Sequence, residues 1–308
     1  MTSPAITGEK IWLDGELVPW DAAQVHILTH TLHYGLGVFE GIRCYRTDDG
    51  GSAVFRLAEH VDRLFESAHI NLMEIPFSRE QVTAAILECL RVNQLAEGYI
   101  RPLVFIGTGA MGLHPGDNPI RVAVIVWPWG KYLGEEGMER GIRAKVSTFS
   151  RHFINAKMPK GKTCGDYVNS ILAKREALLD GYDEAILLDT TGLVSEATGE
   201  NVFVVRNDEL RTPGRQTILE GITRASVMEI AQDKGMTVLE SPITRDELYV
   251  ADEVFLTGTA AEVTPVREID HRTVGAGRRG PVAKALQEAF FDIVAGRDAK
   301  YERWLTPV

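Results

Sequence analysis

Cysteine is scarce in this sequence, and no apolar run is long enough to cross a membrane. The 308 residues include 3 cysteines, which lie far apart and form no CxxC pair. Neither a disulfide framework nor a cysteine-rich metal site is therefore expected. The longest apolar stretch, 121–129, falls well short of the roughly 20 residues of a membrane helix. The first residues also lack the basic and apolar segments of a secretory signal. We expect a reduced, cytoplasmic protein.

Positive charge is also in short supply. The chain has 33 Lys and Arg against 43 Asp and Glu, a formal net charge of −10. Such a chain is a poor non-specific ligand for polyanions, so nucleic acid is not an expected partner. The hydrophobic fraction of 44% and the charged fraction of 25% are those of an ordinary globular protein, here long enough for about two domains.

The common nucleotide-binding, hydrolase and metalloprotease motifs are absent. The glycine-rich segment 107–112 (GTGAMG) is soon followed by a His-Pro pair instead of an apolar helix, so we do not expect a dinucleotide loop. His26, His30 and His33 have the spacing of helical metal ligands. No carboxylate at matching spacing completes such a set, and we expect no metal.

The first half of the chain mixes strand and helix patterns without a regular βαβ repeat. A DG dipeptide between two apolar segments predicts a hairpin at 10–20. Apolar residues at helical spacing predict amphipathic helices at 59–70 and 79–93. Further strands are expected at 38–45, 53–56, 100–106 and 121–129. Strands followed by helices and strands again indicate an α+β fold.

Glycine, proline and charge interrupt the pattern at 129–138, which we interpret as an interdomain loop. The boundary predicts a small α+β domain at 1–128 and a larger domain at 139–308. In the larger one, strand patterns again mix with helices. Helices are expected at 167–179, 224–234 and 282–294.

Three lysines, Lys157, Lys160 and Lys162, stand in a glycine-containing segment just before a predicted helix. One interpretation is a solvated basic loop. The other is a Schiff-base lysine, which needs a desolvated amine with a lowered pKa. Spacing alone does not choose among the three.

Downstream segments carry three further weak signals. Glu196 and Glu200 lie in a turn before an apolar strand, where a carboxylate is costly unless it meets a cation such as a pyridinium, or they belong to a solvated turn. Thr223 begins a helix whose N–H groups could bind a phosphate, although taken alone it is more typical of a simple N-cap. The small-residue turn at 257–262 could bring backbone amides to an anion, or be only a tight turn.

Taken in order, these segments resemble the class IV aminotransferases, the pyridoxal-phosphate enzymes of fold type IV. Two further motifs are similar to those of the branched-chain amino acid aminotransferases. The matching segments are K-T-C-G-D-Y (162–167), S-E-A-T-G-E-N-V-F (195–203), E-G-I-T-R (220–224), T-G-T-A-A-E-V-T-P (257–265), H-Y-G-L-G-V-F-E-G-I-R-C-Y (33–45) and G-Y-I-R-P-L (98–103). The resemblance extends from about residue 12 to residue 291.

The resemblance implies a two-domain α+β fold, with a small N-terminal domain, a larger β-barrel-like C-terminal domain and pyridoxal 5′-phosphate between them. It selects Lys162 as the lysine that binds the cofactor covalently. It also implies that Tyr167 bonds the ring's phenolate oxygen and that Glu196 pairs with the pyridine nitrogen, which keeps the ring an electron sink. The phosphate-binding residues it implies are Arg63, Ile222, Thr223 and Thr259.

Substrate recognition follows from the same resemblance. One pocket must accept an aliphatic side chain and, in the other half-reaction, the γ-carboxylate of glutamate. The family's solution is an apolar, aromatic pocket with a cation at its edge, which the Y-x-R element of Tyr99 and Arg101 supplies. The remaining implied substrate residues are Tyr34, Phe39, Arg43, Met111, Trp129, Tyr132, Thr259 and Ala260.

The expected activity is reversible transfer of the amino group of leucine, isoleucine or valine to 2-oxoglutarate by a ping-pong mechanism. The resemblance further implies a homodimer, or a larger assembly of dimers, because family members build the site across a dimer interface. A D-amino-acid aminotransferase or an aminodeoxychorismate lyase would share Lys162 and Glu196, but usually lacks the motifs at 33–45 and 98–103. A non-catalytic anion-binding protein would leave Lys162 and Glu196 without a purpose.

Overall fold

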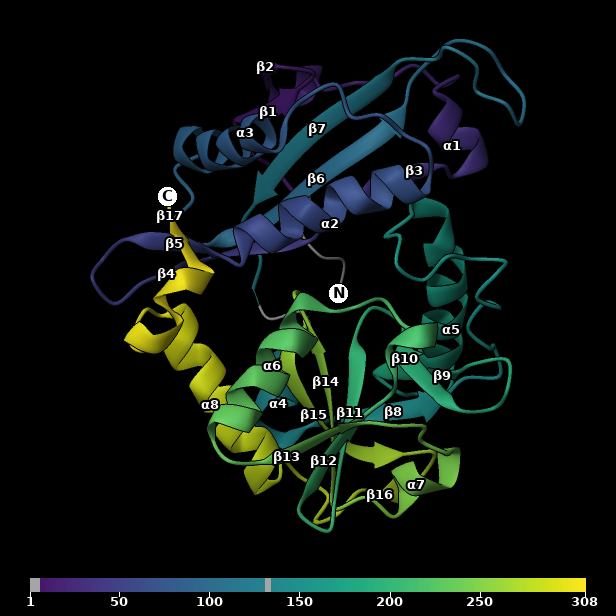
Figure 1. Ribbon diagram of the computed structural model, residues 1–308, viewed down its shortest axis with the longest axis vertical. Helices are drawn as coiled ribbons and strands as arrows, with labels where there is room; N and C mark the ends of the chain where they lie inside the picture. Colours follow the sequence, from purple (N-terminus) through teal and green to yellow (C-terminus); the bar gives the residue numbers. More distant parts are fainter. Residues whose placement is uncertain (1–5, 131–133) are drawn as a thin grey trace. The chain divides into compact units, whose positions relative to one another are not determined.

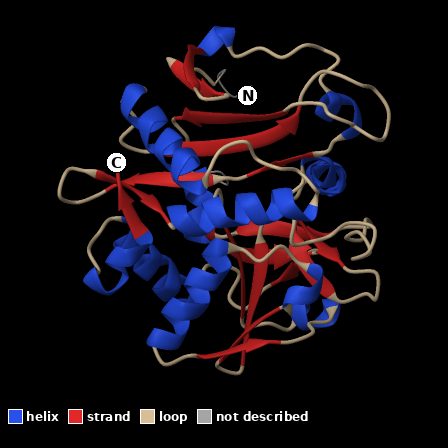
Figure 2. Cartoon of the chain, turned by 45° about the horizontal axis from the view of Figure 1, so that its top comes forward, coloured by secondary structure: helices blue, strands red, loops and turns tan. Residues whose placement is uncertain are grey.

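The computed structural model describes residues 6–130 and 134–308. The chain divides into two compact units (Figure 1). Unit 1 comprises 1–130, 161–166 and 293–308, and unit 2 comprises 131–160 and 167–292. Each unit combines a sheet with helices, as Figure 2 shows by colour, so the expected α+β class is confirmed. No described helix has the length and apolar character needed to span a membrane.

An antiparallel sheet of eight strands forms the centre of unit 1. Its order is β17-β5-β4-β6-β7-β1-β2, and β3 also pairs with β6. The strand bounds are β1 Lys10–Leu13, β2 Glu16–Pro19, β3 Gly37–Phe39, β4 Ile42–Arg46, β5 Ser52–Phe55, β6 Gly98–Ile106, β7 Ile120–Trp127 and β17 Leu305–Pro307. The DG pair closes the β1–β2 hairpin as expected, because Asp14 and Gly15 both adopt positive φ angles, 50° and 101°.

Helices α2 (Leu57–Ile70) and α3 (Arg79–Val92) pack on this sheet (Figure 1). Their apolar faces join β4, β6 and β7 in one buried core. Ser78 and Gln81 form a capping box that begins α3. Both helices lie close to where the sequence predicts them. The short α1 (His30–Tyr34) ends at Gly35, which has a φ of 75°.

The strand predicted at 38–45 is wrong in one respect, because it is interrupted at Glu40 and Gly41. Strand β3 ends at Phe39 and β4 begins at Ile42, and both pair with β6. A Cβ on Gly41 would lie 1.9 Å from the Tyr99 hydroxyl, so any side chain there would displace Tyr99. The break turns the Glu40 side chain into the unit, where it is fully buried.

Unit 2 contains a mixed sheet of nine strands in the order β10-β9-β8-β15-β14-β11-β12-β13, with β16 on β15. The strand bounds are β8 Ile142–Val146, β9 Glu184–Leu188, β10 Val194–Ala197, β11 Asn201–Arg206, β12 Glu209–Thr212, β13 Thr237–Glu240, β14 Glu253–Gly258, β15 Glu262–Ile269 and β16 Arg272–Thr273. The helices are α4 Gly134–Arg140, α5 Tyr167–Leu179, α6 Ile222–Asp233, α7 Arg245–Tyr249 and α8 Pro281–Val294. Helix α4 lies partly within 129–138, where the sequence indicates a loop.

Two segments beyond residue 139 belong to unit 1. The segment 161–166 joins it through an isolated bridge between Val38 and Thr163. The last residues join it because β17 pairs with β5. The lysine segment 161–163 is thereby held by unit 1, although most of the chain around it lies in unit 2.

Candidate active site

Lys162 is held by its own backbone against unit 1. Its carbonyl accepts a hydrogen bond of 3.1 Å from the Phe39 N–H, and its N–H donates one of 3.0 Å to the Ser67 hydroxyl. The amine nitrogen Nζ lies 5.2 Å from the centre of the Phe39 ring. Desolvation, followed by the positive charge of Arg63, lowers the pKa of Lys162 below its ordinary value. A lowered pKa is what an amine nucleophile requires.

Lys160 has a different environment in unit 2. Its Nζ lies 2.9 Å from the Glu220 carboxylate and also donates to the Arg215 carbonyl. An ammonium group held by a carboxylate and a carbonyl serves to fix a loop. Of these two lysines, Lys162 has the environment of a reactive amine.

Arg101, the cation predicted to bind the substrate's γ-carboxylate, lies among aromatic rings in unit 1. The Arg101 guanidinium on β6 lies 4.6 Å from the ring centre of Phe39, 5.4 Å from Tyr99 and 5.8 Å from Trp127. Within the described residues, the buried Nε of Arg101 has no hydrogen-bond partner. Trp129 lies edge-on to Tyr99, with 4.3 Å between ring centres. Trp127 belongs to this cluster, although the sequence analysis did not select it.

Arg43 contacts the backbone beside this cluster. Its Nη2 donates to the carbonyls of Trp129 at 2.9 Å and Gly130 at 3.2 Å, so it fixes the chain just after β7. Tyr132 lies outside the described residues.

Tyr34 and Met111 lie on two segments that a histidine joins. His30 is buried, its ring is tilted against that of Tyr34 with 4.6 Å between ring centres, and its Nε2 lies 2.7 Å from the Gly112 carbonyl. Both Tyr34 and Met111 are exposed. His30 therefore has a structural partner, and the described residues contain no group of three or more His, Cys, Asp or Glu placed to hold a metal.

In unit 2, Glu196 is buried on β10 and is fixed by two contacts. Its Oε1 lies 3.0 Å from Nε of Arg151, and its Oε2 accepts the N–H of Leu219 at 3.1 Å. Arg151 is buried too, and it donates to the Ser170 hydroxyl at 2.9 Å and the Ala197 carbonyl at 2.6 Å. Arg151 is a candidate site residue for which the sequence pattern gave no signal.

Glu200 has the opposite electrostatic environment. It is buried, and desolvation together with the charge of Glu184 raises its pKa above the ordinary range. Glu184 is itself paired with Lys174 at 2.6 Å and accepts a bond from Thr198. A neutral carboxylic acid does not stabilise a protonated pyridine, so of the two candidates Glu196 fits that role.

An uncapped helix N-terminus lies in the same unit. Gly221 is the N-cap of α6 and has no side-chain cap, and Thr223 lies inside the helix, so the alternative of a threonine N-cap is wrong. The side chain of Asn201 donates to the Leu219 carbonyl at 3.0 Å, and Asn201 pairs in register with Thr257. Asn201 thus links the segment just before α6 to the end of β14. The sequence pattern gave no signal for Asn201 either.

Each unit, taken by itself, has groups that suit a part of pyridoxal phosphate. Unit 1 offers an amine with a lowered pKa at Lys162 and a buried guanidinium at Arg63. Unit 2 offers a fixed carboxylate at Glu196 and the uncapped start of α6. The hydroxyl of Thr257 is fully buried and has no hydrogen-bond partner within the described residues, as expected of a group with an absent ligand nearby.

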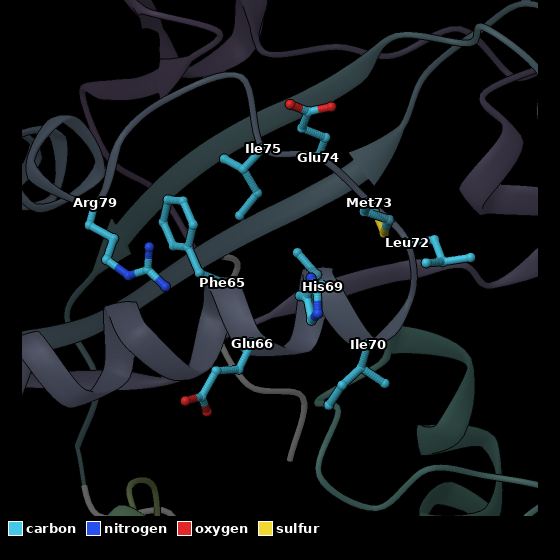
Figure 3. Close-up of a pocket in the computed structure, with 10 residues that line it drawn as sticks. Phe65, Glu66, His69, Ile70, Leu72, Met73, Glu74, Ile75 and Arg79 are labelled. Carbon is cyan, nitrogen blue, oxygen red and sulfur yellow. The ribbon is translucent and has the colours of Figure 1, made fainter.

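A hollow of about 840 Å³ lies elsewhere in unit 1, between α2 and the segment 71–79 (Figure 3). It contains none of the predicted site residues. Its lining includes Phe65, Glu66, His69, Met73 and Arg79. We do not assign the chemistry to it.

The model of the amino-transferase class IV family matches residues 37–269. The chain belongs to this family, and class IV members use pyridoxal phosphate. The branched-chain-amino-acid aminotransferase of Pseudomonas aeruginosa is 50% identical to it over 298 residues, 97% of each chain. That of Escherichia coli K12 is 44% identical over 302 residues, again 97% of each.

Solved structures of branched-chain amino acid aminotransferases are similar to this chain as well. A T.th. branched-chain amino acid aminotransferase, solved with pyridoxamine 5′-phosphate, has a TM-score of 0.95 and 49% identity, covering 98% of this chain and 99% of that one. The Escherichia coli branched-chain amino acid aminotransferase has a TM-score of 0.95 and 43% identity, covering 97% and 99%. The expected fold type is confirmed.

Proposed function

We propose that the protein is a branched-chain amino acid aminotransferase, which moves the amino group of L-leucine, L-isoleucine or L-valine to 2-oxoglutarate. The near-complete match to relatives of that name supports this activity. The observation that carries the chemistry is Lys162, whose backbone is bonded on both sides and whose amine has a lowered pKa.

The residues have separate tasks. Pyridoxal phosphate, when bound, supplies the electron sink that accepts the electron pair left on the substrate's Cα. Nζ of Lys162, in its neutral form, takes the proton from the substrate's Cα and would deliver it to C4′ of the cofactor, and the reverse half-reaction returns it to Cα. Glu196, fixed by Arg151, holds a proton on the pyridine nitrogen. Tyr167 donates to the phenolate oxygen.

The phosphate is an anion and needs charged and backbone donors. We assign it to Arg63, to Ile222 and Thr223 at the start of α6, and to Thr259. The α-carboxylate of the substrate takes the amides of Thr259 and Ala260. Arg101 pairs with the γ-carboxylate of glutamate. The apolar walls are assigned to Tyr34, Phe39, Tyr99, Met111, Trp129 and Tyr132, with Arg43 at their edge.

Borohydride reduction tests the lysine assignment. The protein loaded with pyridoxal phosphate is reduced, digested and analysed by mass spectrometry. We expect the pyridoxyl group on Lys162 alone. A label on Lys157 or Lys160 would overturn the assignment while leaving the activity to be tested separately.

We further propose that the protein works in the cytoplasm as a homodimer or a larger homo-oligomer. Exposed apolar side chains support this assembly, because Ile27, Leu32 and Leu113 are 73%, 59% and 90% exposed. They belong to the same segments as Tyr34 and Met111, which His30 joins. Large exposed apolar groups at adjoining loops are typical of an interface.

A further inference from the structure

Glu40 is a buried carboxylate that none of the assignments above uses. It follows β3 and has no exposed surface. Burying a carboxylate is costly unless several donors satisfy it. Because Glu40 also lies beside the segment that carries Lys162, its charge can influence the groups around that lysine.

Two side chains of α2 satisfy this carboxylate. Arg63 donates from Nε to Oε1 at 2.6 Å and from Nη2 to Oε2 at 2.9 Å. His60 places Nδ1 2.7 Å from Oε2. Burial lowers the pKa of His60, so its neutral ring donates the bond. Despite its burial, these partners lower the pKa of Glu40 well below its ordinary range, so the carboxylate is ionised.

The same face of α2 also holds the lysine segment. His60, Arg63, Ser67 and Asn71 follow one another at spacings of three and four residues, which places them on one side of the helix. Ser67 accepts the N–H of Lys162, and Asn71 donates to the Thr163 hydroxyl at 3.1 Å. One stripe of polar side chains thus links Glu40, Arg63 and Lys162.

The paired geometry fixes the orientation of Arg63. A two-bond contact holds the guanidinium plane in that of the carboxylate and uses two of its five N–H donors. The other donors then have fixed directions. Without the Glu40 carboxylate, the guanidinium of Arg63 would lose the two bonds that set its orientation. Its positive charge near Lys162 would also no longer be offset by Glu40.

We propose that Glu40 is a positioning residue, which acts through Arg63 to prepare unit 1 for the phosphate group of the cofactor. This inference rests on the proposed assignment of the phosphate to Arg63. Glu40 does not touch the cofactor in this account. Its effect is therefore specific to the phosphate and disappears when Arg63 is absent.

The test compares the affinity of the apoprotein for pyridoxal phosphate with that for pyridoxal, which lacks the phosphate. We expect Glu40→Gln to reduce the ratio of the two affinities about 10-fold, the size of one charge-assisted hydrogen bond. Arg63→Met should reduce it at least as much. The double variant should be no worse than Arg63→Met, because Glu40 then has nothing to position.

Ser67→Ala is the matched control, since Ser67 lies on the same face of α2 and contacts Lys162 but not Arg63. It should leave the ratio unchanged. If Glu40→Gln does not fold, judged by circular dichroism, Glu40→Asp takes its place, because the shorter side chain cannot keep both bonds to Arg63.

The possible results distinguish the role of Glu40 from the assignment of the phosphate to Arg63. An unchanged ratio in the folded Glu40 variant, with a reduced ratio in Arg63→Met, overturns the role of Glu40. An equal loss for pyridoxal and pyridoxal phosphate also overturns it, because that indicates a general structural role. An unchanged ratio in Arg63→Met overturns the assignment of the phosphate to Arg63. None of these results depends on whether leucine is the substrate.

Discussion

At the scale of single residues, the chemistry depends on charges that are buried or partly buried and individually fixed. Glu196 meets Arg151 at 3.0 Å, and Arg101 lies among three aromatic rings. Buried charges lose much of their hydration, so each one interacts strongly with what approaches it. Replacing one of them should therefore change a particular step and leave the others largely intact.

Glu196→Gln removes the charge that holds a proton on the pyridine nitrogen. Losing one charge-assisted hydrogen bond costs about 1.5–3 kcal/mol, so we expect the single-turnover rate with L-leucine to fall roughly 10- to 100-fold. The control is Glu200→Gln, since the raised pKa of Glu200 makes it neutral in the native protein. A larger loss in Glu200→Gln than in Glu196→Gln would reverse the two assignments.

Arg101→Leu should separate the two substrates. The γ-carboxylate of glutamate cannot be desolvated without a cation, so we expect that half-reaction to lose about 2–5 kcal/mol of transition-state stabilisation. The half-reaction with leucine should change by less than about 1 kcal/mol, because methyl groups need no such partner. Cofactor absorbance follows both. Equal losses would show that Arg101 supports structure, and Arg43 would be tested next.

At the scale of elements, a helix start and a strand turn are tied together. Asn201 pairs in register with Thr257 and bonds the Leu219 carbonyl two residues before Gly221. A Cβ on Gly221 would lie 2.0 Å from Oδ1 of Asn201. A side chain at residue 221 would therefore force either Asn201 or the start of α6 to move.

Gly221→Ala should displace Asn201 or the first turn of α6. Because backbone N–H groups at a helix start bind phosphate by their fixed direction, we expect at least a several-fold weaker affinity for pyridoxal phosphate, measured by titration of the apoprotein. Ala225→Gly is the control. Residue 225 is exposed on the same helix, so this change weakens α6 by about 1 kcal/mol without touching Asn201. Equal effects of the two variants would mean that helix stability alone matters.

At the scale of the whole molecule, local patterns predicted most elements but not the long-range partners. The helices at 57–70 and 79–92 follow from apolar spacing, and the first hairpin follows from Asp14 and Gly15. Arg151 meets Glu196 only because their segments are adjacent in the folded unit. No periodicity encodes such a contact, so the sequence alone could not select Arg151.

The three lysines between residues 157 and 162 show again that local patterns do not identify long-range partners. Spacing left Lys157, Lys160 and Lys162 as alternatives, and the resemblance chose Lys162. The structure supplies the physical difference, since Lys160 pairs with Glu220 while the Lys162 backbone bonds to Phe39 and Ser67. The signal for Glu40 was already present in the F-E-G-I-R motif, as a carboxylate between apolar residues of an expected strand. Its partners on α2 became visible only in three dimensions.

The exposed apolar residues of unit 1 predict that the protein assembles into an oligomer. We expect the native mass, measured by light scattering after gel filtration, to be that of a dimer or a larger oligomer. Changing Leu32 and Leu113 together to Glu should shift it towards the monomer, because it places charges on an apolar interface. The control is Leu72→Glu, a change at an exposed leucine outside these segments. A monomeric native protein would contradict the proposed assembly.

A single turnover tests directly whether the protein transfers the amino group of L-leucine to 2-oxoglutarate. The protein loaded with pyridoxal phosphate is mixed with L-leucine in the absence of any oxo acid, and the 2-oxo acid formed is measured against the concentration of Lys162-bound cofactor. We expect one equivalent of 4-methyl-2-oxopentanoate, and one equivalent of L-glutamate when 2-oxoglutarate is then added. No oxo acid from L-leucine, or its formation from D-leucine instead, would contradict it.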